Sequence, residues 1–399
     1  MATTGPLAAS RAYLADTARA YSALFFLDSP IAGALLLAGT FAYPNIGLSG
    51  LVAAFAGLAM ARLFRFPDAR TTIIVLNSLL VGLSLGAFYR LGPHLVVLVL
   101  GGAVLAVLAS TALADLFWRY ERLPVLVIPF LLVAAITALV ARQLSDLSPF
   151  VGYSEFTIAW LPYWANDFLS LLGATFFTIH PVAGAVVLAV IAWRSRYLAL
   201  LAIVATLVGQ GMFLLLEVNH QPLLITWAGF NMVLTAIAIG GIYTVPGLAS
   251  FITAMLAAAL TTLLLIACQN LLFVHGLPLI ALPYISVTLL FLLALRTRLS
   301  VAPPRLATQP GMPEQNYERA RLTRVRNGEI DSVPLLLPVF GQWQIYQGFD
   351  GEHTHKPPWH HALDFYMAEE EKSFSGDGTG LEDFYCFGLP VVSPAHGQV

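Results

Sequence analysis

The sequence predicts an all-α polytopic membrane protein that ends in part of an all-β domain. Hydrophobic residues make up 58% of the 399 residues and charged residues 11%, against roughly 25% charged residues in a soluble domain. Apolar stretches near the ~20 residues that a spanning helix needs follow one another through residues 1–300, at 31–42, 95–113, 123–140, 182–193, 198–216, 251–267 and 277–295. The bilayer is therefore the expected surroundings of this region, and no nucleic-acid partner is expected.

The membrane region contains an internal sequence duplication. Asn77, with Leu80, Gly86 and Tyr89, returns 154 positions later as Asn231, with Leu234, Gly240 and Tyr243. A Leu-Pro…Pro-aromatic box at 123–130 returns at 277–284, and Phe25-Phe26 with Pro30 and Gly33 returns as Phe176-Phe177 with Pro181 and Gly184. We expect repeats at about 20–142 and 171–298. If each has five spans, the odd number inverts the second, and inverted repeats interrupted by prolines indicate a solute pathway where they meet.

The distribution of positive charge predicts the orientation. Residues 1–300 contain no lysine. With five spans in each repeat, only Arg90 and Arg142 fall on one face of the membrane. The other face holds Arg11, Arg19, Arg62, Arg65, Arg70, Arg119, Arg122, Arg194, Arg196, Arg296 and Arg298. The positive-inside rule makes that face cytoplasmic. We expect a multi-pass protein of the inner (plasma) membrane with its C-terminal side in the cytoplasm.

The chain changes character after Ser300. Residues 301–332 carry several prolines and a basic, helix-compatible run, and we expect a linker there. Residues 333–399 alternate short apolar stretches with Gly, Asp and His, which is typical of the first strands of an all-β domain. The only cysteines are Cys268 and Cys386, so neither a disulfide framework nor a cysteine zinc site is expected.

At Asn77, Asn231 and the two boxes, residues 20–298 resemble the urea transporter family. The boxes read Leu123-Pro-Val-Leu-Val-Ile-Pro-Phe130 and Leu277-Pro-Leu-Ile-Ala-Leu-Pro-Tyr284. The resemblance implies ten spanning helices in two inverted five-helix halves, two pore half-helices and a narrow slot in each protomer of a homotrimer. We interpret Asn77 and Asn231 as amides that link helices rather than as solute ligands.

The resemblance also implies which residues line the slot. Its walls would be Phe26, Leu76 and Leu80 in the first half and Phe177, Phe230 and Leu234 in the second. The family's slot-lining box threonines correspond to Val127 and Ala281, and its Gln or Glu before the wall Phe corresponds to Ala23 and Ala174. This chain therefore lacks four side-chain polar groups at the expected slot, and backbone carbonyls near the half-helices would have to supply its oxygens.

The C-terminal part resembles the opening of lysostaphin-like zinc metallopeptidases. The similarity lies in Gln347-Gly-Phe-Asp through His361-Ala-Leu-Asp364 and in the Gly388-Leu-Pro-Val-Val segment. These enzymes bind zinc through a His-x-x-x-Asp pair and a later His-x-His, so a complete domain would hold zinc. His360 and Asp364 have the pair's spacing, and His355 is a rival first ligand. No His-x-His follows Asp364 in this chain.

Two functions from different classes fit these observations. The first is a passive channel for urea or a similar small neutral polar solute. The alternative is a membrane-anchored zinc metallopeptidase of the peptidoglycan-cleaving type, whose transporter-like helices serve as an anchor. Its C-terminal side would then be periplasmic. The missing slot oxygens favour the alternative, whereas the missing His-x-His opposes it. For this chain by itself we expect no peptidase activity.

Overall fold

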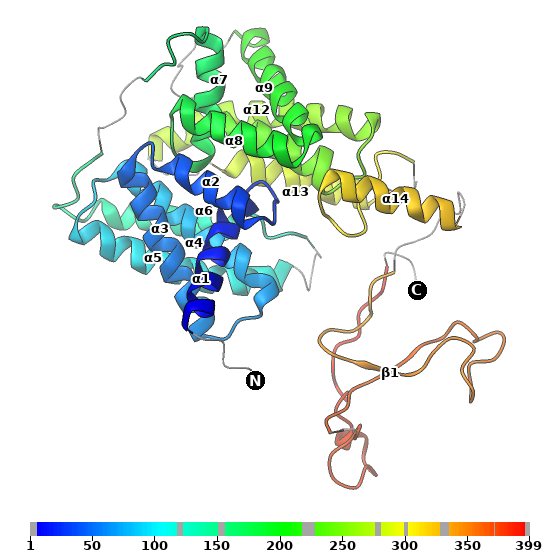
Figure 1. The fold of residues 1–399 in the computed structure, drawn as a ribbon. Helices are drawn as coiled ribbons and strands as arrows, with labels where there is room; N and C mark the ends of the chain where they lie inside the picture. Colours follow the sequence, from blue (N-terminus) through cyan, green and yellow to red (C-terminus); the bar gives the residue numbers. More distant parts are fainter. Residues whose placement is uncertain are drawn as a thin grey trace. The chain divides into compact units, whose positions relative to one another are not determined.

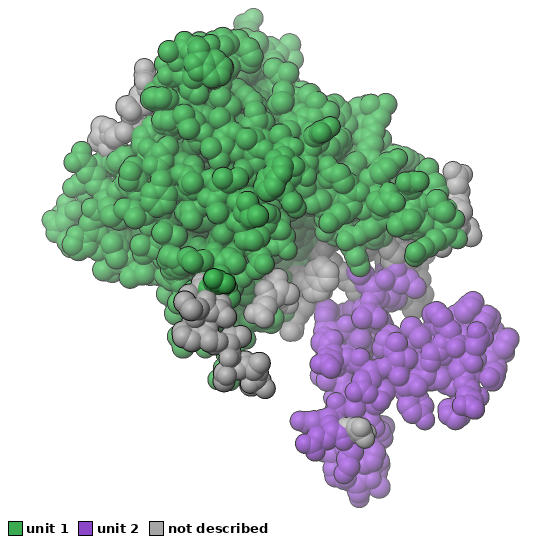
Figure 2. Space-filling view, in the orientation of Figure 1, with its two compact units in different colours: residues 1–328 green, residues 329–399 purple. Residues whose placement is uncertain are grey.

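A computed structural model describes residues 6–117, 123–150, 156–217, 228–275, 281–298, 302–327, 335–370 and 372–395. The chain forms two compact units, residues 1–328 and 329–399, which Figure 2 colours separately. Each unit is described by itself below.

Unit 1 is mostly helical in its described residues (Figure 1). The first half holds α1 (Pro6–Ala23), α2 (Pro30–Thr40), α3 (Pro44–Leu63), α4 (Asp68–Phe88), α5 (Pro93–Leu116) and α6 (Ile128–Ala141). The second holds α7 (Tyr163–Gly173), η2 (Ala174–Phe176), α8 (Pro181–Arg194), α9 (Arg196–Leu215), α11 (Phe230–Ile237), the π-helical turn η3 (Ala238–Ile242), α12 (Leu248–His275) and α13 (Leu282–Arg296). Helix α14 (Pro313–Asn327) follows.

Five described helices are long and apolar enough to cross a membrane: α3, α4 from Thr71, α5, α9 and α12 as far as Cys268. The pair formed by α7–η2 and α8, bent by 79°, makes a sixth span if it is counted as one. Helices α2, α6, α11–η3 and α13 are apolar but shorter. Large apolar side chains such as Val97, Leu207 and Leu256 are exposed on the outside of the longer helices, which suits lipid contact. The prediction of a polytopic helical membrane protein is confirmed.

The two halves make the same contacts at matching positions. The backbone N–H of Phe130 donates to Asn77 Oδ1 over 3.0 Å, and the N–H of Tyr284 donates to Asn231 Oδ1 over 3.1 Å. Both pairs are 53 residues apart. The start of α2 is capped by Ser29 and the start of α8 by His180. The Ser29 side chain accepts a hydrogen bond from the N–H of Ala32, and the His180 side chain accepts one from the N–H of Val182. The duplication seen in the sequence is therefore present in the structure.

Counterparts also touch each other where the halves meet. The rings of Phe25 and Phe176, which are the same position of the repeat, lie 5.9 Å apart in an edge-to-face arrangement. Helix α2 packs on its counterpart α8, and Figure 1 shows the blue-to-cyan helices of the first half on one side of this contact and the green-to-yellow helices on the other. A contact between counterparts is what an approximate two-fold axis produces.

The segment expected to be a linker contains a helix that docks on unit 1. Asn316 of α14 is buried, and its Nδ2 donates to the carbonyls of Gly241, Ile242 and Gly311 over 2.8–3.0 Å. The hydroxyl of Ser195 donates to Glu314 over 2.5 Å. Residues 313–327 thus carry the basic helix that the sequence indicates, and its first turn packs against η3.

Unit 2 contains one small sheet in its described residues. Strands β1 (Gln344–Gln347) and β2 (Asp364–Tyr366) pair antiparallel, with Gln344 opposite Tyr366 and Gln347 opposite Asp364. A short 3-10 helix, η4 (Leu381–Asp383), follows. The rest of the described unit is turns and extended chain. The strands expected after the linker are present here as a single pair.

Candidate functional site

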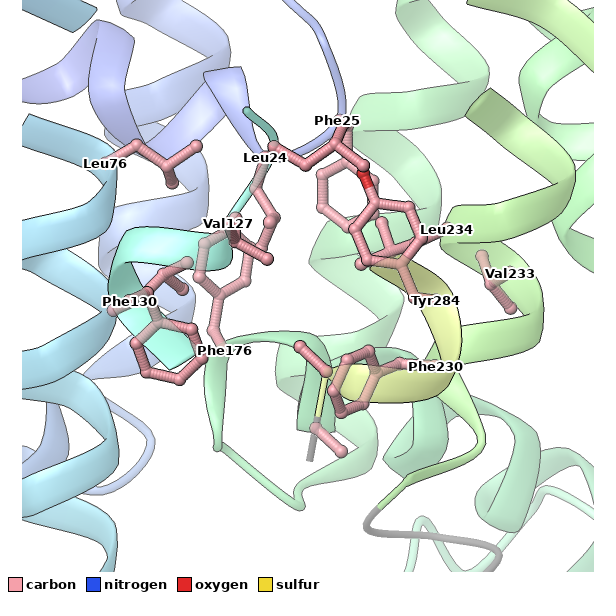
Figure 3. Close-up of a cluster of buried hydrophobic side chains, with 14 of the residues drawn as sticks. Leu24, Phe25, Leu76, Val127, Phe130, Phe176, Phe230, Val233, Leu234 and Tyr284 are labelled. Carbon is pink, nitrogen blue, oxygen red and sulfur yellow. The ribbon is translucent and has the colours of Figure 1, made fainter. Parts of the chain in front are cut away.

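The residues expected to form the slot lie in the core shared by the two halves. Seven of them are buried, and Phe26 is partly buried against the same cluster; the seven are Leu76, Leu80, Val127, Phe177, Phe230, Leu234 and Ala281. Figure 3 shows Leu76 and Val127 on the side of the first half, facing Phe230 and Leu234 of the second. The structure thus brings together side chains that are far apart in the sequence.

Phe26 and Phe177 share an unusual backbone conformation. Both have φ of 59°, in the left-handed region, and both lie at the break between two helices. The N–H of Phe26 bonds the carbonyl of Ala23 and that of Phe177 bonds the carbonyl of Ala174, over 2.9 and 2.8 Å. A bulky residue in this conformation costs on the order of 1–3 kcal/mol, and such strain clusters at functional sites. Its recurrence in both halves indicates that the ring positions matter.

The two members of each Phe-Phe pair have different neighbours. Phe25 and Phe176 pack on each other at the junction of the halves. Phe177 instead meets the ring of Phe130 edge-to-face at 5.9 Å, and Phe26 meets Tyr243 edge-to-face at 5.7 Å. The second Phe of each pair therefore contacts either a box or the end of the segment that begins at Asn231. That these two rings line a solute path stays a prediction.

The two boxes each begin a short helix inside the core. Val127 and Ala281 precede α6 and α13, and their carbonyls accept bonds from Leu131 and Ile285. Proline in the first turn leaves no N–H unsatisfied there. The side chains of Val127 and Ala281 are apolar, so these positions supply no hydrogen-bonding side chain to the slot. Helices of 14 and 15 residues match the expected half-helices.

Asn77 and Asn231 fix these helices rather than face a solute. Each amide oxygen accepts the N–H of the aromatic residue that ends the box of its own half, Phe130 for Asn77 and Tyr284 for Asn231. Each amide nitrogen donates to a carbonyl of its own segment, that of Ile73 or Ala228. Both side chains are fully buried. They therefore link helices, as interpreted from the sequence.

Two hydroxyl groups on α13 were not singled out from the sequence. Tyr284 stands where the first half has Phe130, and its ring lies in the cluster of Figure 3. Thr288 is fully buried one turn further along, and its Oγ1 has no hydrogen-bond partner. A comparison of the two copies of the repeat could have identified them, because Tyr284 stands in place of Phe130 and Thr288 in place of Ala134.

In unit 2 one of the two candidate histidines, His355, contacts Asp364. His355 is buried, its Nε2 lies 3.1 Å from Asp364 Oδ1, and its Nδ1 lies 2.7 Å from the carbonyl of Gly348. A carbonyl can only accept, so Nδ1 carries the proton. Gln347 Nε2 donates to the other carboxylate oxygen of Asp364 over 3.1 Å. Within the described part of unit 2, no hydrogen bond or ion pair joins His360 to Asp364, and the His360 ring rests on His361.

The described residues of unit 2 do not complete a zinc site. Zinc needs at least three protein ligands, and the described residues contain no group of three His, Cys, Asp or Glu able to hold a metal ion. His355 and Asp364 make two. Further hydrogen bonds hold both side chains in place: His355 Nδ1 bonds the carbonyl of Gly348, and the second carboxylate oxygen of Asp364 accepts from Gln347.

Comparison with known proteins gives a consistent result for unit 1. A family model described as "Urea transporter" matches residues 14–296. Three curated proteins are similar to the chain, all described as "Urea transporter 1". Those of Ovis aries and Capra hircus are 25% identical over 289 residues, and that of Rattus norvegicus is 29% identical over 292. Each alignment covers 69% of this chain and 75% of the relative.

Proposed function

The chain belongs to the urea transporter family, and on that premise we propose that unit 1 is a passive channel for urea or a similar small neutral polar solute. The observation that carries the proposal is the matched pair Phe26 and Phe177. Both are held in a strained conformation at the same place in each half and are directed into the shared core. Two such rings suit the faces of a flat molecule.

The physical requirements of such a solute agree with this lining. Urea is planar, neutral and strongly polar, so removing its water without replacement hydrogen bonds is costly. Aromatic and aliphatic walls, here Leu76 of the first half facing Phe230 and Leu234 of the second, would sandwich the faces and leave the edges free for hydrogen bonds. Phe26 and Phe177 would complete these walls. An apolar lining has no group to hold an ion, which supports diffusion without ion coupling.

A flux measurement tests the proposal. The full chain is reconstituted in liposomes, and the permeability to urea, formamide and acetamide is measured by light scattering with and without an ion gradient. We expect permeability above that of protein-free liposomes and unchanged by the ion gradient. Phe177→Arg should return it to the protein-free value, whereas Phe64→Arg, at an exposed position beside Arg65, should not. Wild-type flux equal to that of protein-free liposomes would contradict the proposal.

We also propose the assembly and orientation that the family and the arginines imply. A homotrimer would bury part of the exposed apolar surface of the longer helices, and native mass spectrometry of the detergent-solubilised chain tests it. The C-terminal side would be cytoplasmic. Cys386 of unit 2 is a natural reporter, because Cys268 is buried. A membrane-impermeant maleimide should label it only after intact cells are opened, with Cys386→Ser as control. Labelling of intact cells would reverse the orientation.

For residues 333–399 we propose the first part of a lysostaphin-like domain, joined to the membrane unit by residues 301–332. The contact between His355 and Asp364 favours this second candidate. With two metal ligands among the described residues, we assign no catalytic step to it. Placed in the cytoplasm, such a domain would bind or sense rather than cleave cell-wall peptides.

A further inference from the structure

We infer that the hydroxyls of Tyr284 and Thr288 on α13 are the polar, selectivity-determining contacts of the solute path. This inference rests on the proposed channel function. Val127 and Ala281 supply no hydrogen-bonding side chain to the path. The two hydroxyls would supply these groups instead, and both belong to the second half of the membrane unit.

The position of Tyr284 follows from its counterpart. Phe130, at the same place of the first half, has its ring against the wall residue Phe177. Tyr284 begins from an equally fixed backbone, because its N–H is held by the buried amide of Asn231. Figure 3 shows its ring beside Leu234, with the hydroxyl oxygen reaching toward Leu24 and Phe25 of the first half. The phenol thus crosses from one half toward the other within the buried cluster.

Thr288 lies on the same side of the helix. At 100° per residue, position 288 falls between the directions of 281 and 284, so it faces where those residues face. Its Oγ1 is buried without a hydrogen-bond partner, although threonines in helices often bond the carbonyl one turn back, as Thr206 and Thr261 do here. A buried unpaired hydroxyl requires an explanation. A passing solute that bonds it supplies one.

The two residues lie one turn apart on α13, with their Cα atoms about 6 Å apart along the helix axis at 1.5 Å per residue, and their hydroxyls form a short polar track. Each hydroxyl can accept an N–H and donate to a carbonyl, which are the two groups of a small planar amide. The remaining lining is apolar, so the track fixes which edge of the amide is stabilised. Solutes with different numbers of N–H groups should therefore depend on it to different extents.

The test compares hydroxyl-deleted variants with matched controls in the same liposome assay. Tyr284→Phe makes this position identical to Phe130, and we expect urea permeability to fall roughly fivefold or more, the effect of losing one buried hydrogen-bond partner. Thr288→Val should act in the same direction, and Thr288→Ser should keep the wild-type rate. Tyr197→Phe and Thr206→Val, which remove hydroxyls from α9, should leave permeability unchanged.

The ratio of urea to formamide permeability separates solute binding from a structural effect. Urea has N–H groups on two nitrogens and formamide on one, so loss of a hydroxyl should lower the ratio, whereas a distorted path lowers both rates together. Wild-type flux with an unchanged ratio in Tyr284→Phe and Thr288→Val would overturn this inference and leave the channel standing. Absence of wild-type flux would refute the channel and the inference with it.

Discussion

Gly33 and Gly184 allow α2 to approach α1 closely and α8 to approach α7 closely. Adding one methyl group at either position tests this. A Cβ on Gly33 would collide with the carbonyl oxygen of Ala18, and a Cβ on Gly184 with that of Leu169. It would also lie 3.2 Å from the Cα of Ala18 or 3.0 Å from the Cα of Leu169. The opposing atoms are backbone, so no side chain can turn away.

The size of the effect follows from that geometry. Carbon atoms pack best at about 3.5–4.0 Å, so the paired helices would have to separate by on the order of 1 Å or more. Overpacking of a core costs typically 1–3 kcal/mol. We expect about 3 kcal/mol for Gly33→Ala or Gly184→Ala, because backbone opposes the new group.

Thermal unfolding of the full chain in detergent, followed by tryptophan fluorescence, measures the loss. Gly101→Ala and Gly211→Ala are matched controls, since a Cβ at either position meets nothing within 4 Å. Neither change should destabilise the chain, because Ala is favoured over Gly inside a helix by roughly 0.5–1 kcal/mol. Solute flux should fall with stability, because the separated segments carry Phe26 and Phe177. If Gly184→Ala unfolds at the same temperature as Gly211→Ala, the close approach of α7 and α8 is wrong.

Three further outcomes are expected. Asn77→Ala and Asn231→Ala should each lower the free energy of unfolding by about 1–3 kcal/mol, because a buried N–H at the start of a half-helix loses its acceptor; equal stability to wild type would contradict the linking role. Asn316→Ala should release the first turn of α14 and speed trypsin cleavage at the arginines of that helix, and an unchanged cleavage rate would mean that docking does not depend on the amide. The full chain should bind zinc weakly in calorimetry, with His355→Ala abolishing the heat and His360→Ala leaving it; the opposite pattern would restore His360 as the ligand.

The arrangement of the membrane unit could be predicted because the same motifs occur in both halves, so that a contact expected in one half is expected in the other as well. Pairing Asn77 with the first box and Asn231 with the second requires only that both copies fold alike, and the contacts confirm this. The local conformations could not be predicted in the same way. In the first half the Asn helix continues as regular α-helix to Phe88, whereas the second copy widens into the π-helical turn η3 at Gly240–Gly241. The motifs alone do not reveal that difference.

Tertiary contacts explain the remaining differences. The segment after Ser300 has the prolines and polarity of a tether, yet one amide, that of Asn316, reaches three backbone carbonyls and anchors α14. The spacing to Asp364 favours His360 by motif, but the turn before β2 bonds the His360 carbonyl to the N–H of Asp350 and brings His355 to the carboxylate instead. Neither contact has a periodic signature in the sequence.

Phe25 and Phe176 occupy the same position of the repeat and touch each other. In an assembly of two identical subunits, a mutation at such a position changes both sides of the contact at once, and both must be tolerated together. Joining the halves in one gene removes that restriction, because each copy then mutates separately. Tyr284 opposite Phe130 and Thr288 opposite Ala134 are differences that only a fused pair can hold. Two nearly equivalent scaffolds can in this way enclose a path that has hydroxyl groups on the side of one half alone.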